Sequence, residues 1–138
     1  MGKVTDICIS EKRGTLKDSV DSCEIVFGYG VKGDGHGGDW DMQVSVFPEE
    51  ALDKVPEDMY EEVMAGGKTE NITIKGIELE KMMPGNIIVI GDVELEIKKV
   101  GKDKYKTHDR HYIVSREGRF CRVLKSGSVK VGDEVLVR

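Results

Sequence analysis

The sequence predicts a mainly β protein, a barrel or sandwich built of short strands with a few small helices. Short apolar runs recur along the chain and are separated by turn-forming pairs such as Gly-Asp and Pro-Gly. Segments 85–89 and 132–137 both place glycine and a turn-forming residue before a short apolar strand. Such strands bury their apolar faces by closing into a barrel or a sandwich. At 138 residues, the chain is predicted to form one domain, 1–138.

The first half of the chain is predicted to form three strands and then two helical stretches. The strands are expected at 3–9, 22–27 and 43–47, with a polar connector at 17–21. Pro48 and Pro56 suit the first position of a helix, and acidic residues follow each of them. The second stretch ends at Gly66-Gly67 and is predicted to be a packing helix.

After residue 70 the pattern is one of strands and turns. Strands are expected at 71–75, 87–90, 93–98, 119–125 and 134–137, with a helical turn at 78–83. Residues 87–90 are continuously apolar, which predicts a strand covered on both faces. Residues 93–98 alternate between apolar and charged side chains, which predicts a half-buried strand. The basic segment 101–111 is predicted to be an exposed loop.

Composition excludes several classes of function. The net charge of −5 argues against nonspecific binding to nucleic acid through a basic surface. No apolar run approaches the roughly 20 residues that span a bilayer, and the first residues match neither a signal peptide nor a myristoylation site. We therefore expect a cytoplasmic protein without nucleic-acid or membrane partners. Cys8, Cys23 and Cys121 are widely spaced and odd in number, so neither a disulfide framework nor a structural zinc site is expected.

The glycine-rich segment 28–44 is the predicted floor of a binding site. Six of its first eleven residues are glycine. Ordering glycine costs backbone entropy, a cost usually tolerated where the backbone must approach a partner closely or adopt a positive φ. Asp34, His36, Asp39 and Trp40 lie among these glycines. A nest of backbone amides in such a loop can bind an anion.

Of two more specific interpretations of this segment, the dinucleotide site fails and the metal site is not favoured. Residues 28–33 match G-x-G-x-x-G, but the residues that follow cannot begin the helix that a dinucleotide site requires. Asp34, His36 and Asp39 are metal-ligating residue types, yet their spacing matches no dependable metal signature. We therefore expect no metal bound by the protein alone, and favour hydrogen bonding by His36, either within the loop or to a ligand.

A basic cluster stands out in this acidic chain. It consists of Arg116, Arg119, Arg122 and Lys125. If residues 119–125 form a strand, Arg119 and Cys121 share one face. A neighbouring guanidinium favours the thiolate that a nucleophilic or persulfide-carrying cysteine requires. The alternative, which we favour, is that Cys121 is a small residue filling the barrel interior.

Three blocks of the sequence, in order, resemble the MOSC domain, named for the C-terminal part of molybdenum cofactor sulfurase. The blocks are 30–38 with 43–45; 69–73 with 76–77, 83–85 and 90–93; and 116–124 with Gly127 and 131–133. Residues 33–38 are similar to the family's G-D-x-H-x-G, 43–45 to its Q-V-S, and 70–73 to its E-N-[IL]-T. Together the blocks span nearly the whole chain.

This resemblance implies a MOSC-type β-barrel that binds or delivers the molybdenum cofactor (molybdopterin), an anionic pterin. In that interpretation the glycine loop and Glu70-Asn71 shape the site, His36 positions the ligand, and arginines neutralise phosphate. The ligand-binding residues it implies are Gly33, Asp34, His36, Gly38, Gln43, Glu70, Asn71, Arg116, Arg119 and Arg122. The implied protein partners are a molybdoenzyme or a sulfur donor protein.

The chain departs from the family at one position that bears on catalysis. The family's usual cysteine follows the strand equivalent to 93–100, where this chain has Gly-Lys-Asp-Lys-Tyr at 101–105. Cys121 is the remaining candidate for a sulfur carrier, and only if the fold brings it to the site. Three hypotheses therefore stay open: cofactor binding or delivery, a sulfur-carrier enzyme that uses Cys121, and a non-catalytic interaction module.

Overall fold

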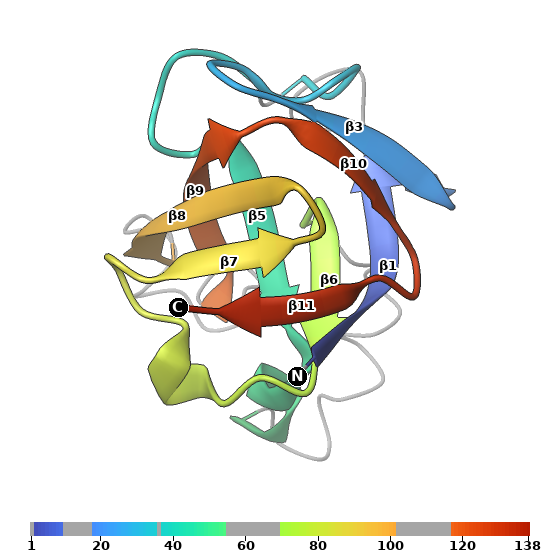
Figure 1. The fold of residues 1–138 in the computed structure, drawn as a ribbon. Helices are drawn as coiled ribbons and strands as arrows, with labels where there is room; N and C mark the ends of the chain where they lie inside the picture. The colour runs from blue at the N-terminus through green and yellow to red at the C-terminus, as the bar shows by residue number, and fades with distance from the viewer. Residues whose placement is uncertain (1, 10–17, 36, 55–69, 102–116) are drawn as a thin grey trace.

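The computed structural model describes residues 2–9, 18–35, 37–54, 70–101 and 117–138 (Figure 1). Within these ranges the chain forms short strands and two 3-10 helices. The strands are β1 (Gly2–Ile9), β2 (Asp18–Val20), β3 (Ser22–Val26), β4 (Gly30–Val31), β5 (Val44–Pro48), β6 (Ile72–Lys75), β7 (Ile87–Ile90), β8 (Val93–Val100), β9 (Arg119–Lys125), β10 (Gly127–Lys130) and β11 (Glu134–Val137). The helices are η1 (Glu49–Lys54) and η3 (Leu79–Lys81). None of the described helices is long and apolar enough to cross a membrane.

A closed barrel organises the described part of the molecule. Its strands follow the order β11-β7-β8-β9-β5-β6-β1, and β11 also pairs with β1, which closes the sheet (Figure 1). Neighbouring strands of the barrel are antiparallel except β5 and β6, which run parallel with Val46 opposite Ile72. A smaller sheet, β10-β3-β4, lies against the barrel beside the glycine loop. The predicted mainly β barrel is confirmed.

Apolar side chains at alternate positions of the strands fill the barrel interior. On β8, Val93, Leu95 and Ile97 are fully buried, as the alternating pattern predicts. On β7, Ile88 and Ile90 are buried whereas Ile87 and Val89 are half-buried, so the prediction of a strand covered on both faces is wrong there. Among the described strands of the barrel, the one buried along its whole length is β5, whose sequence alternates.

The two segments with similar sequences lie side by side. β7 and β11 pair with Leu136 opposite Val89 and Val137 opposite Ile88. Gly85 and Gly132 precede them with φ of 97° and 95°, a conformation that favours glycine at each turn.

Other differences from the expected elements are local. The predicted connector at 17–21 contains the edge strand β2, and β4 and β10 were not predicted. Helix η1 follows Pro48 as expected, in 3-10 form. The second helical stretch at Pro56 and all but Gly101 of segment 101–111 lie outside the described residues.

Candidate functional site

Buried polar side chains gather where the glycine loop joins β5. Among the described residues, the buried polar or charged side chains are Asp34, Gln43, Ser45, Glu70, Asn71, Thr73 and Arg119. The parallel pairing of β5 with β6 places the residues before each strand next to one another. Segments 43–45 and 70–71, distant in sequence, therefore meet at one end of the barrel. We call this end the loop end.

The glycine loop is held by its own backbone. The Lys32 amide donates to the Glu24 carbonyl (2.9 Å), and the Asp34 amide donates to the Val31 carbonyl (3.0 Å). Gly30 has φ of 127°, and a side chain there would overlap the backbone carbonyl of Gln43. Glycine is therefore required at position 30 both by conformation and by close approach.

Gln43 joins this loop to the barrel wall. Its amide Nε2 donates to the Gly38 carbonyl (2.9 Å), and its Oε1 accepts from the Val123 amide (2.9 Å). The side chain is fully buried. Since both ends of the Gln43 amide bind the protein backbone, the residue acts as a brace for the loop, and contact with a ligand stays a prediction.

Asn71 connects three strands at the same end. Its Oδ1 accepts from the amide (3.1 Å) and the hydroxyl (3.2 Å) of Ser45, and its Nδ2 donates to the Cys8 carbonyl (3.3 Å). The Cys8 amide in turn donates to the Asn71 carbonyl (2.7 Å). Asn71 therefore ties the start of β6 to β5 and β1. Ser45, which was not among the predicted site residues, was marked by its place in the Q-V-S motif.

Two carboxylates are buried near this junction. Asp34 is 1% exposed and Glu70 is 3% exposed. Burial, with Glu24 and Asp34 nearby, raises the pKa of the Cys23 thiol to about 11. Asp34 therefore lies near Cys23 of β3.

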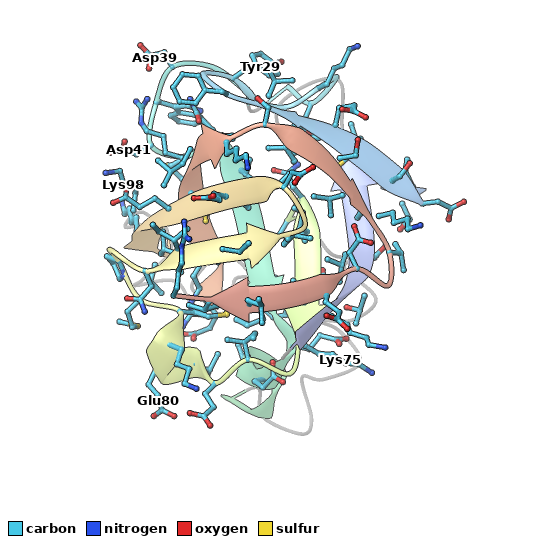
Figure 2. All side chains as sticks on the ribbon, in the orientation of Figure 1. Tyr29, Asp39, Asp41, Lys75, Glu80 and Lys98 are labelled. Atoms are coloured by element: carbon cyan, nitrogen blue, oxygen red, sulfur yellow. The ribbon has the colours of Figure 1, made fainter. Side chains whose placement is uncertain are left out.

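Arg122 faces the glycine loop from the outer face of β9. Its Nε donates to Asp41 Oδ1 and its Nη1 to Asp39 Oδ1, each at 3.0 Å. These two carboxylates raise the pKa of Arg122. Figure 2 shows Asp39, Asp41 and Tyr29 on the same upper side of the molecule, opposite Glu80 and Lys75. Arg122 is thus the described arginine that the fold brings to the loop.

Arg119 is held differently, close to helix η3. Its Nε donates to the Met82 carbonyl (3.0 Å), and its Nη1 donates to the carbonyl of Glu117 (2.6 Å) and contacts its carboxylate (3.4 Å). The residue is 2% exposed, and burial lowers its pKa while Glu117 opposes that effect. Its partners are protein groups, so binding of phosphate by Arg119 stays a prediction.

Cys121 lies in the hydrophobic core. Its side chain is fully buried, on the same face of β9 as Val123. Burial raises the pKa of the thiol, and the opposing charge of Arg119 does not offset it. This is the position that we favoured from the sequence, a small residue in the barrel interior, whereas the alternative was a thiolate favoured by Arg119. Removal from water outweighs the neighbouring charge.

The remaining predicted site residues are placed only in part. His36 and Arg116 lie outside the described residues. Gly33 is exposed with φ of 86°, and Gly38 has φ of 144°. No group of three histidine, cysteine or acidic side chains within the described ranges is arranged to hold a metal ion. The glycine loop therefore carries Asp34, Gly38 and Gln43, with Arg122 bound to it through Asp39 and Asp41. Asn71 binds Ser45, two residues after Gln43.

Comparisons with solved structures agree on the barrel. The YuaD protein from Bacillus subtilis has a TM-score of 0.70 and 18% identity, covering 99% of this chain and 96% of its own. YiiM from Geobacillus stearothermophilus has a TM-score of 0.67 and 17% identity, covering 100% of this chain and 75% of its own. YiiM from Escherichia coli has a TM-score of 0.58 and 18% identity, covering 99% of this chain and 70% of its own. At these identities the likeness shows the fold alone.

The sequence comparison is more specific. No curated protein matches the chain. The sequence model of the MOSC domain, however, matches residues 32–136, which include the glycine loop, the Glu70-Asn71 junction and β9. The chain belongs to the MOSC domain family.

Proposed function

We propose that this chain binds the molybdenum cofactor, or a precursor of it, at the loop end of the barrel. MOSC domains are in general associated with binding of this cofactor and with sulfur transfer. The observation that carries the proposal is the junction of two motif blocks at one end of the barrel, where Ser45 binds Asn71 and Gln43 binds the Gly38 carbonyl of the glycine loop. Buried polar groups that are not required by the core alone commonly mark a functional site.

The residues at this end suit the two chemical parts of the cofactor. A pterin ring presents N–H donors, for which the carboxylates of Asp34 and Glu70 are suitable acceptors. A phosphate group suits Arg122 and the backbone amides of the glycine loop. When bound, the cofactor supplies molybdenum and its sulfur ligands, so the protein need only hold and orient it. Roles for Gly33, His36, Gly38 and Arg116 stay part of the proposal.

Binding or delivery is favoured over sulfur transfer through Cys121. A sulfur carrier needs an accessible thiolate, whereas the Cys121 thiol is buried and its pKa is raised. A sulfur-carrier role for Cys121 is therefore the second hypothesis. The variant Cys121→Ala distinguishes the two, since unchanged sulfuration of a molybdoenzyme partner would remove the carrier hypothesis.

The proposal is tested by expressing the protein in a molybdenum-replete host and analysing what co-purifies. We expect molybdenum by elemental mass spectrometry and pterin by fluorescence after oxidation, in a constant ratio to protein. Asp34→Asn and Arg122→Gln should each lower the bound pterin severalfold. Glu134→Gln, an exposed change on β11 away from the loop end, is the matched control. Wild-type protein that carries no pterin, and takes up none when molybdopterin is added, would contradict the proposal.

A further inference from the structure

Tyr29 makes two hydrogen bonds to the part of the glycine loop that contains the predicted ligand residues. We call residues 34–38 the arch. The hydroxyl of Tyr29 donates to the Asp34 carbonyl at 2.7 Å. The Gly38 amide donates to the Tyr29 carbonyl at 2.8 Å. One residue thus binds both ends of the arch.

The ring of Tyr29 also packs directly on the arch backbone. A methyl group built on Gly37 would overlap Cε2 and Cζ of the Tyr29 ring. Glycine at position 37 therefore permits a close approach that another residue would prevent. The ring stays 38% exposed, so it lies over the arch at the surface rather than in the core.

The barrel wall supports the arch from the other side. Gln43 donates to the Gly38 carbonyl, and the Gly37 amide donates to the Asp34 carbonyl at 3.3 Å. Protein groups therefore bind the carbonyls at both ends of the arch, and Tyr29 supplies one of these bonds. The hydroxyl bond to Asp34 is the one that a single conservative substitution removes without touching the core.

We infer that Tyr29 is a positioning residue, which acts on a bound ligand through the arch. It holds Asp34 and Gly38, the two ends of the arch, and so limits how the backbone of the arch faces a ligand. The inference rests on the proposed function for its ligand, an anionic pterin. Tyr29 was not among the predicted site residues, and its only signal was an aromatic residue within a run of glycines.

The first test is Tyr29→Phe, which keeps the ring and removes the hydroxyl. We expect a nearly unchanged unfolding midpoint, about fivefold weaker binding of molybdopterin, and about fivefold faster amide exchange at Gly37 and Gly38. The NMR signals of the His36 ring should shift. Phe27→Leu is the matched control, because Phe27 is a 66% exposed aromatic residue whose backbone amide donates to the Ser126 hydroxyl and not to the arch.

The second test is a double-mutant cycle between the ring and the glycine that it covers. Gly37→Ala should weaken binding in the wild-type background, because the new methyl group displaces the Tyr29 ring. In a Tyr29→Ala background the same change should cost much less, giving a clear coupling between the two positions. Additive effects would show that the ring does not act on the arch.

These measurements separate the inference from the proposed function. Wild-type affinity in Tyr29→Phe, with unchanged His36 signals and amide exchange, would overturn the positioning role. If the wild-type protein binds no molybdopterin, the proposed function fails. The NMR and exchange measurements then still decide whether Tyr29 holds the arch.

Discussion

Arg119 and Arg122 lie three residues apart on β9, yet their surroundings differ in every respect. Arg119 is buried and binds the Met82 carbonyl and Glu117 near helix η3. Arg122 is on the opposite face of the strand, where it pairs with the exposed carboxylates of Asp39 and Asp41. The two arginines therefore belong to different regions, one that holds the barrel together and one that borders the loop.

The difference arises from the period of the strand. Successive residues of a strand point to opposite faces, so positions 119 and 122 cannot share a face. Arginines that are close together along a strand can therefore lie on two different faces. Arg119, on the inner face, binds groups of the barrel, and Arg122, on the outer face, binds carboxylates of the glycine loop.

The largest expected effect is on stability, from Arg119→Met. The change removes the Arg119 hydrogen bond to the Met82 carbonyl and the Arg119 ion pair with Glu117, and we expect a loss of about 3 kcal/mol in the free energy of unfolding. Arg119→Lys should recover part of it, because it restores the charge without the planar fork. Urea unfolding measures both.

Arg122→Met is the comparison for that prediction. Its ion pairs are exposed, and such pairs contribute little to stability, so the unfolding midpoint should hardly move. Equal losses for the two variants would remove the distinction between the two regions.

An intermediate effect is expected from pH, through Cys121. The pKa of its thiol is raised from a usual value of 9.0 by burial. Above pH 9 the unfolded thiol ionises while the folded thiol keeps its proton. The unfolded state then binds fewer protons, so the free energy of unfolding falls as the pH rises, by at most about 1.4 kcal/mol per pH unit.

The measurement is the difference in unfolding free energy between wild type and Cys121→Ala from pH 8 to 10.5. We expect the two curves to converge above pH 9, since only the wild type loses the contribution of this thiol. Native protein should also resist alkylation at Cys121. Parallel curves, or rapid alkylation, would place Cys121 in a polar environment resembling that of Arg122.

The smallest effect is expected at the loop end, from Asp39→Asn combined with Asp41→Asn. The pair of changes releases Arg122 from its carboxylates, and binding of inorganic pyrophosphate should tighten by about twofold to fivefold. Calorimetric titration at fixed ionic strength measures it. Adding Arg122→Gln should cancel the gain.

A control with the same change in net charge separates local from general attraction. Glu80→Gln with Glu134→Gln removes two exposed carboxylates away from the loop end. If this control binds pyrophosphate as tightly as the loop variant, the gain does not come from Arg122.

The sequence motifs selected polar residues that the fold buries, but they did not reveal the roles of these residues. Asp34, Gln43, Glu70, Asn71 and Arg119 were chosen from motifs, and all five are buried polar residues. A motif identifies residues that are required at a position, either to bind a ligand or to hold other parts of the chain in place. Gln43 binds Val123, Asn71 binds Ser45 and Arg119 binds Met82. These partners are distant in the sequence, and no local pattern reveals them.

By itself, the sequence determined the mainly β class, most strand positions and the glycine turns, because alternation and positive φ are properties of neighbouring residues. Only the tertiary structure decided that β5, and not β7, is buried along its length, that Arg119 turns to Met82 while Arg122 turns to the loop, and that Tyr29 covers Gly37. These outcomes depend on what packs against each face. The alternation of residues along one strand indicates the face to which each side chain points, but not the group that packs against it.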